Sequence, residues 1–263
     1  IGTTTATGNG NVTDLGAPNP TEHGVCWNTT GSPTVSDSRT DEGEATATGA
    51  FASGITSLSP GTPYYVRAYA TNTAGTAYGN EVSFTTEATT PAVTTTAPSS
   101  ITDSTAVSGG DVTSDGGAEV TARGVCWSAT PNPTTSDNTT VDGNGTGIFS
   151  SSLTGLSPGT PYHVRAYATN SEGTAYGEDK MFTTEAAPPT AVTQPASSVT
   201  SFSAALNGTV NPNGAETTVT FEWGTDTAYG NTATAAQSPL NGTEEQAVSA
   251  ELSGLTPCQV YHF

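Results

Sequence analysis

Polar and apolar residues alternate with a period of two in the most regular stretches of this chain. The clearest stretch spans residues 162–170, where every second side chain is apolar: Tyr162, Val164, Ala166 and Ala168. This alternation predicts a β-strand with one buried face. A Pro-Gly pair at 158–159 predicts a tight turn just before it. No stretch shows the periodicity of a helix.

The same turn and strand recur, which indicates that the chain is built from repeats. Residues 58–72 and 156–170 are nearly identical, and the pattern begins a third time at 255–263. The first two copies start 98 positions apart (156 minus 58), about the length of one β-sandwich domain. We therefore expect an all-β fold of tandem antiparallel Greek-key sandwiches, with domains at 1–87, 88–185 and 186–263.

The second domain is the only one predicted to be complete. Its turn signals and alternating segments predict strands near 92–97, 104–113, 119–128, 147–153, 162–170 and 174–184. Domain 1 begins at the equivalent of the second strand, so it lacks the first strand, and domain 3 lacks the last strands. Two explanations stay open: the residues belong to a longer array, or neighbouring subunits supply the missing strands.

The repeated motifs resemble a known family. A Leu-x-Pro-Gly-Thr-x-Tyr corner is followed by Tyr-x-Val-x-Ala-x-Ala-x-Asn and a Gly-x-x-Tyr-Gly hairpin that ends in Phe-Thr-Thr. This combination resembles fibronectin type III domains, and the Gly-Val-Cys-Trp segments resemble the fibronectin-like repeats of bacterial secreted and surface proteins. The resemblance implies immunoglobulin-like sandwiches with a tyrosine corner in each domain, formed by Leu58, Tyr64, Leu156, Tyr162, Leu255 and Tyr261.

The net negative charge of the chain disfavours some classes of binding partner. The chain carries 24 acidic residues against 5 Lys and Arg, a net charge of −19 at pH 7. Such a field repels nucleic acid and anionic membrane surfaces, so we expect neither as a partner. No run of about 18 apolar residues predicts a membrane span. An acidic, Thr-rich surface favours an extracellular or cell-surface location. Because the chain has no initiator Met, we expect it to be a mature or excised portion of a longer protein.

Three cysteines leave at least one thiol without an intrachain partner. Cys26 and Cys126 hold the same place in successive domains, on the strand face opposite Val125 and Trp127. Cys258 stands where the corner turns of the first two domains have glycine, an exposed place. The alternatives are inert thiols or an intermolecular disulfide through Cys258 in an oxidising compartment.

The sequence also contains candidates for calcium binding and for glycosylation. Acidic loops could bind Ca²⁺, which takes six to eight oxygen ligands, and the candidate ligands are Asp37, Glu42, Asp137 and Asp142. Their spacing matches no known calcium motif, so a solvated loop is the alternative. Asn-x-Ser/Thr acceptors for glycosylation occur at Asn11, Asn28, Asn138, Asn144, Asn207 and Asn241.

Aromatic residues favour packing over binding. Trp27, Trp127 and Trp223 recur at matching strand positions, which predicts core packing rather than a platform for sugars. Tyr69 and Tyr167 fall on the opposite, outward face and are expected to pair across strands. No nucleophile–base set, carboxylate pair or phosphate loop is evident, so we expect no enzyme and no cofactor other than the calcium considered above.

The linkers at 87–91 and 185–189 are short and contain proline, which predicts a semi-rigid rod about 100 Å long. We therefore expect a non-catalytic structural or adhesive protein, part of a surface stalk, adhesin or filament. Its expected partners are other copies of itself or neighbouring repeats, and surface polysaccharide is a further candidate. The alternative is a spacer or carbohydrate-binding region of a secreted polysaccharide-active enzyme whose catalytic domain lies elsewhere.

Overall fold

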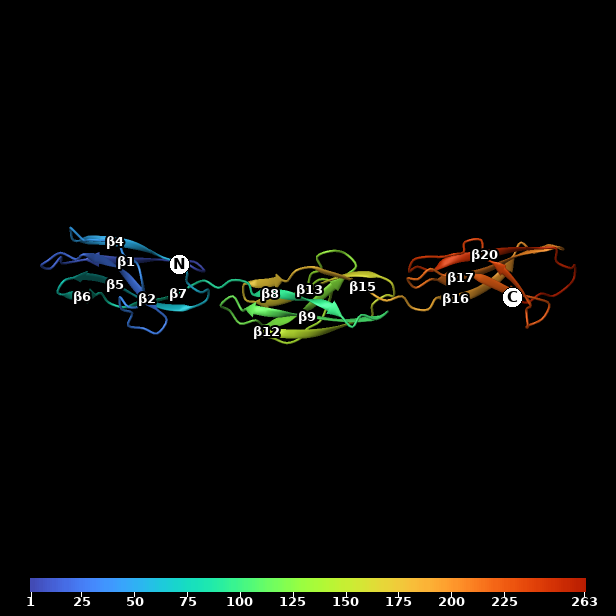
Figure 1. The fold of residues 1–263 in the computed structure, drawn as a ribbon, viewed down its shortest axis with the longest axis horizontal. Coiled ribbons are helices and arrows are strands. Elements are labelled where there is room, and N and C mark those ends of the chain that lie inside the picture. The colour runs from blue at the N-terminus through green and yellow to red at the C-terminus, as the bar shows by residue number, and fades with distance from the viewer.

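Three β-domains follow one another in a row and give the molecule the form of a rod (Figure 1). The computed structural model describes all of residues 1–263 and contains twenty β-strands, all of which pair in antiparallel fashion. No segment forms a helix that is long and apolar enough to cross a membrane. The predicted fold class, tandem antiparallel β-sandwiches, is confirmed.

Domain 2 consists of two sheets. One sheet has three strands in the order β12-β9-β8: β12 (Gly147–Thr154), β9 (Thr105–Ser114) and β8 (Ala92–Ser99). The other sheet has five strands, with β13 paired to β10, β14 and β15: β10 (Ala122–Ser128), β11 (Asn138–Thr139), β13 (Pro161–Asn170), β14 (Gly173–Tyr176) and β15 (Lys180–Thr183). Twelve buried residues from both sheets form its core, among them Val125, Leu153 and Val164.

The single strand predicted at 174–184 is wrong, because the structure divides it at Gly177. β14 pairs with the second half of β13 and β15 with the first half. Between them, the Gly177 amide donates to the Ala166 carbonyl, and Asp179 turns aside to accept from the Asn132 amide at 2.8 Å. The carboxylate of Asp179 also lies 3.0 Å from Nδ1 of His163, so polar contacts replace the sheet ladder at this point.

Domain 1 repeats this plan without a counterpart of β8. Its small sheet holds only β1 (Ala6–Val12) and β4 (Gly49–Ile55). The five-stranded sheet consists of β2 (Glu22–Asn28), β3 (Ser38–Arg39), β5 (Pro63–Asn72), β6 (Gly75–Tyr78) and β7 (Val82–Thr85). Its core cluster has 6 buried residues against 12 in domain 2, because the two sheets are not closed by a first strand.

Domain 3 has the first strand and lacks the last ones. Its sheets are β16 (Thr190–Ser197), β17 (Ser203–Asn211) and β20 (Gln246–Ser253), and the pair β18 (Thr220–Trp223) and β19 (Asn231–Thr234). Residues 261–263 contribute a single bridge, between His262 and Gly224. All eight residues of β16 are exposed, and this strand packs chiefly against β17 alone.

The expectation that Tyr69 and Tyr167 face outward is wrong, since both side chains are buried. Tyr69 and Tyr167 lie opposite Gly24 and Gly124 of the neighbouring strand, which have no side chain there. Each hydroxyl donates to the backbone carbonyl of the residue that directly follows β3 or β11. These bonds are 2.6 Å from Tyr69 to Thr40 and 2.7 Å from Tyr167 to Thr140. The loops therefore fold over the second face of the sheet, and desolvation there raises the pKa of both tyrosines.

Candidate functional site

The two domain junctions are the most specialised features of the chain. At the first junction, the corner turn of domain 1 touches a loop of domain 2, and the contact is glycine on glycine. A Cβ added to Gly117 would lie 2.6 Å from Cα of Gly61 and 2.5 Å from the carbonyl carbon of Pro60. Since real Cβ atoms do not approach so closely, only glycine allows the two backbones to meet there.

The second junction reproduces the first with different residues. Gly159 is the corner glycine of domain 2, and it packs on Gly214 of domain 3, where a Cβ would lie 3.0 Å from the Gly159 amide nitrogen. Gly61 and Gly159 have φ values of 57° and 58°, in the left-handed region that favours glycine. The same backbone geometry therefore joins both pairs of neighbouring domains.

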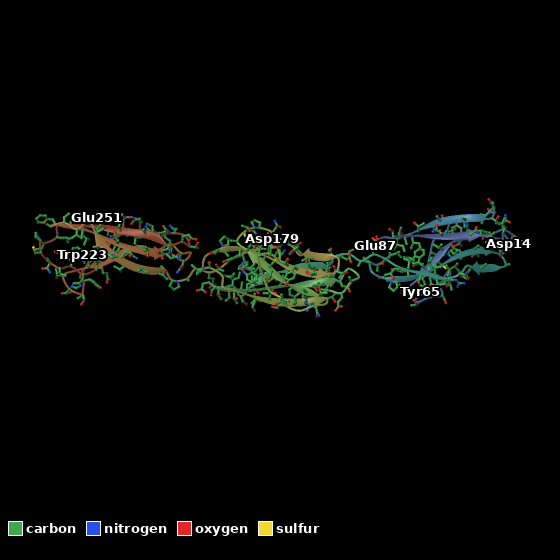
Figure 2. The ribbon with its side chains drawn as sticks, turned by 180° about the vertical axis from the view of Figure 1, so that it is seen from behind. Asp14, Tyr65, Glu87, Asp179, Trp223 and Glu251 are labelled. Carbon is green, nitrogen blue, oxygen red and sulfur yellow. The ribbon has the colours of Figure 1, made fainter.

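Hydrogen bonds hold the first linker on both sides. Glu87, which Figure 2 labels between domains 1 and 2, accepts at its carbonyl from the Gly61 amide at 3.1 Å. The Thr89 amide donates to the Gly116 carbonyl at 2.8 Å. From domain 2, the Asn170 side chain donates to the Thr89 carbonyl at 2.7 Å. The predicted stiffness of the linker thus has a source other than proline alone.

The second linker is bonded in the same manner. The Gly159 amide donates to the Glu185 carbonyl at 2.9 Å, and the Ala187 amide donates to the Asn213 carbonyl at 3.1 Å. The side chain of Asn213 then donates to the Pro188 carbonyl at 2.6 Å. Asn213 comes just before Gly214, so the residue that fixes the linker also positions the glycine of the contact.

Tyrosine corners set the shape of the turn that carries each contact. The hydroxyl oxygens of Tyr64, Tyr162 and Tyr261 accept from the backbone amides of Ser59, Ser157 and Thr256, at 3.0, 3.1 and 3.0 Å. The leucines of the corners, Leu58, Leu156 and Leu255, are all buried. The corner residues named from the sequence therefore lie together in each domain, and in domains 1 and 2 they hold the turn whose glycine meets the next domain.

Cys258 has the same place in the corner of domain 3 and the same backbone conformation, with φ of 61°. Its side chain is exposed and free, as the sequence indicates. Cys26 and Cys126 are buried, and their thiols donate to the backbone carbonyls of Arg67 and Arg165 at 3.6 and 3.5 Å. Burial raises the pKa of the Cys26 thiol, and it raises that of Cys126 to about 11.

We predict that one thiol of the native chain reacts rapidly with a disulfide reagent at pH 8, and that this thiol is Cys258. Cys26 and Cys126 should react only after unfolding, because they are buried and their raised pKa keeps them protonated. Thiol counting before and after denaturation measures this, and Cys258→Ser should remove the rapid reaction. Two or more rapid thiols would contradict the buried placement. The intermolecular disulfide itself stays a prediction, which a non-reducing gel of wild type and variant checks.

Two of the calcium candidates, Asp37 and Glu42, belong to domain 1, and the other two, Asp137 and Asp142, belong to domain 2. Asp37 and Asp137 each accept from a backbone amide, of Thr34 and Thr134, at 2.8 Å, and the bond from Thr34 lowers the pKa of Asp37. Asp142 accepts from the hydroxyls of Thr140 and Ser151, and Glu42 is exposed. No group of three or more acidic, His or Cys side chains could hold a metal ion. Calcium binding stays a prediction, and a melting temperature measured with and without a chelator tests it.

The glycosylation candidates differ in access. Four of the six asparagines are exposed: Asn11, Asn138, Asn144 and Asn241. Asn28 and Asn207 are half-buried, and their side-chain amides donate to the carbonyls of Gly31 and Pro195. An attached sugar would have to break these local bonds. Glycosylation stays a prediction, with the four exposed asparagines as the better acceptors.

The tryptophans lie with the cores. Trp127 belongs to the core of domain 2, and Trp27 and Trp223 pack against the cores of domains 1 and 3. Figure 2 shows Trp223 within domain 3. They do not form an exposed flat platform of the kind that stacks on sugars.

The sequence predicts the turn at 114–117, yet it does not indicate that Gly117 and Gly214 meet the preceding domain. The available signal is an Asp or Asn followed by glycine, which marks any tight turn. Nothing in the local sequence distinguishes a turn that faces solvent from one that faces another domain. Gly117 and Gly214 are therefore the junction residues that the sequence pattern does not identify.

No family model matches the chain, and no curated protein matches it. Among solved structures, the crystal structure of the chicken CNTN1 FN1–FN3 domains is similar to it over 100% of this chain and 88% of that chain. The identity is 15% and the TM-score is 0.41. The assignment as tandem β-sandwiches with tyrosine corners therefore rests on the strands and hydrogen bonds described above.

Proposed function

We propose that the chain is a non-catalytic structural spacer outside the cell or at its surface. It is a rod of three domains in a fixed arrangement, and it works by holding its two ends apart. The observation that carries this proposal is the repeated junction. Two pairs of neighbouring domains, with different loop sequences, use the same close contact between two glycine backbones. A flexible tether needs no such contact, whereas a rod of defined shape does.

The electrostatics and composition support the same role. A net charge of −19 disfavours collapse and self-aggregation of a long rod, and it disfavours nucleic acid as a partner. Other copies of the chain, or further repeats of a longer array, are the partners we propose for its ends. We retain surface polysaccharide only as a lesser proposal, since the tryptophans lie with the cores.

We predict that Gly159→Ala bends or loosens the rod, because the new methyl group would meet Cα of Gly214. Small-angle X-ray scattering should give a maximum dimension of about 100 Å for the wild type. The variant should give a smaller value or a broader distribution of distances. Gly214→Ala, made from the other side of the contact, should have the same effect.

Gly155→Ala is the matched control. Gly155 also has a left-handed backbone, with φ of 70°, but a Cβ there would meet nothing within 4 Å. Both alanine variants carry a similar backbone strain of about 1–2 kcal/mol, so only the contact with the next domain separates them. Unchanged scattering for Gly159→Ala, or equal changes for both variants, would remove the junction as the basis of the spacer function.

A further inference from the structure

Several asparagines of this chain stand directly before a glycine: Asn9, Asn144, Asn207, Asn213 and Asn241. An asparagine in this position can lose its side-chain amide without an enzyme. The backbone nitrogen of the next residue attacks the side-chain carbonyl carbon and closes a five-membered succinimide ring. Glycine as the next residue favours this attack, because it has no side chain to obstruct the ring. The surrounding structure decides which of these Asn-Gly pairs reacts.

Two of the pairs are held in β-sheets. Asn9 lies in β1 and Asn207 in β17, and both residues pair with a neighbouring strand. Ring closure requires the backbone of the asparagine to rotate away from the extended conformation, so the strand would first have to leave its sheet. The Asn207 side chain is also bonded, since it donates to the Pro195 carbonyl at 2.8 Å.

In two further pairs the attacking nitrogen is already bonded. The Gly145 amide donates to the Val120 carbonyl at 2.9 Å. The Gly214 amide donates to the Gly242 carbonyl, also at 2.9 Å. The Asn213 side chain is held as well, through its bond to the second linker. These loops have to open locally before the nitrogen is free to attack.

The fifth pair, Asn241 and Gly242, has none of these restraints. It lies in the loop between β19 and β20, and both residues are exposed. Neither the Gly242 amide nor the side-chain amide of Asn241 donates a hydrogen bond to another group of the protein. A Cβ at Gly242 would meet nothing within 4 Å, so the space that the ring needs is open.

This loop also supports the second domain junction. The Gly242 carbonyl is the acceptor for the amide of Gly214, the domain 3 glycine of that junction. On the other side of Asn241, Leu240 is buried and exchanges two backbone hydrogen bonds with Thr217, at 2.8 and 2.9 Å. Asn241 thus connects a fixed residue to the carbonyl that holds Gly214. A change in main-chain length at Asn241 would displace that carbonyl, because Leu240 cannot follow.

We propose that Asn241 is a site of spontaneous deamidation, and that its isoaspartate product releases the Gly214 amide at the second junction. The Gly242 nitrogen forms a bond to Cγ of Asn241, and the bond from Cγ to Nδ2 breaks. Nδ2 leaves as ammonia, with the proton that the Gly242 nitrogen gives up.

Water then opens the succinimide ring in one of two ways. Addition at the side-chain carbonyl gives aspartate and leaves the main chain unchanged. Addition at the main-chain carbonyl gives isoaspartate, in which the chain runs through Cβ and Cγ and is one methylene group longer before Gly242. The chemical step is independent of the proposed function, and only its consequence for the shape of the rod rests on the spacer role.

Peptide mass spectrometry of the folded 263-residue chain, aged at mildly alkaline pH, tests the chemical step. The chain is produced without glycosylation, because a glycan would occupy Nδ2 of Asn241. Asn241 should convert first, and Asn144 and Asn213 about three- to tenfold more slowly, as expected when one hydrogen bond has to open. In denaturant all the pairs should convert at similar rates. Asn241→Gln should stop the reaction at this site, since its longer side chain would have to close a six-membered ring.

Hydrogen exchange of residues 213–217 tests the effect on the junction. The isoaspartate form, separated by chromatography, should exchange about three- to tenfold faster at the Gly214 amide, because the amide loses its acceptor. Asn241→Asp is the matched control, which supplies the new charge without the extra methylene group and should exchange as the wild type does. This local readout is separate from the scattering test of the spacer function, so the two proposals can fail independently.

Three results would overturn the proposal. The first is conversion of Asn144 or Asn213 in the folded chain at least as fast as that of Asn241. The second is conversion of Asn241 in denaturant alone. The third is unchanged exchange of the Gly214 amide in the isoaspartate form, or an equal increase in Asn241→Asp, because the longer main chain would then have no effect of its own.

Discussion

Leu153→Ala should lower the free energy of unfolding of domain 2 by about 3–4 kcal/mol. Leu153 is 0% exposed, lies on β12 and belongs to the 12-residue core between the two sheets of this domain. Removing its side chain loses the burial of several methyl groups and leaves a cavity that closed sheets on both sides cannot fill. Hydrogen exchange of peptides from β9 and β12, followed by mass spectrometry, measures the loss in this domain alone.

The matched variant is Leu252→Ala in domain 3. Leu252 faces Ala204 in the register that Leu153 has with Ala106. It is 7% exposed and lines an open cleft of about 350 Å³. The cleft leaves the side chain of Leu252 less tightly enclosed than that of Leu153, so we expect a smaller loss of about 2 kcal/mol. Equal losses would contradict the argument that the core of domain 3 is less complete than that of domain 2.

Gly177→Val should destabilise domain 2 by about 2–3 kcal/mol and free β8 from the sandwich. A Cβ at Gly177 would meet the Thr95 hydroxyl and, at 2.7 Å, the Thr95 amide nitrogen, and a backbone atom of a paired strand cannot move aside alone. The bond between Thr95 and Ala166 would be lost with the strand. Hydrogen exchange should rise first in residues 92–99.

Gly79→Val in domain 1 is the internal control for this prediction. The residues are equivalent, since the amides of Gly79 and Gly177 both donate to the alanine carbonyl of the long strand, at 2.8 and 2.9 Å. Gly79 has no strand over it, so the change should alter stability by less than about 0.5 kcal/mol. A large loss of stability in Gly79→Val would mean that the glycine is needed for the turn itself. It would contradict the explanation that Gly177 is a glycine because β8 packs over it.

The linear pattern of residues predicts much of the fold. The alternation at 162–170 and its copy at 64–72 predicts strands, and β13 and β5 occur there. The repeat predicts tandem sandwiches, because each copy carries the same strand and turn signals. The absence of a first strand in domain 1 also follows from comparing the repeats, and the structure has no partner for β1 on that edge.

Side-chain placement on the second sheet face did not follow from the pattern. Alternation assigns Tyr69 and Tyr167 to the polar face, yet both are buried. Alternation reports only which side chains share a face, whereas burial depends on what covers that face. Here a loop distant along the chain covers it, with Thr40 or Thr140 over a glycine.

The sequence by itself determined the fold class, the repeat and the corner turns, because these depend on local alternation, turn residues and copies of one motif. Only the tertiary structure decided that Gly61 meets Gly117 and that Gly159 meets Gly214. The tertiary structure also decided that Gly79 borders an open cleft while its equivalent, Gly177, lies under β8. The local sequence around a turn glycine is the same whether solvent or a neighbouring backbone lies against it. Only the tertiary structure distinguishes these two environments.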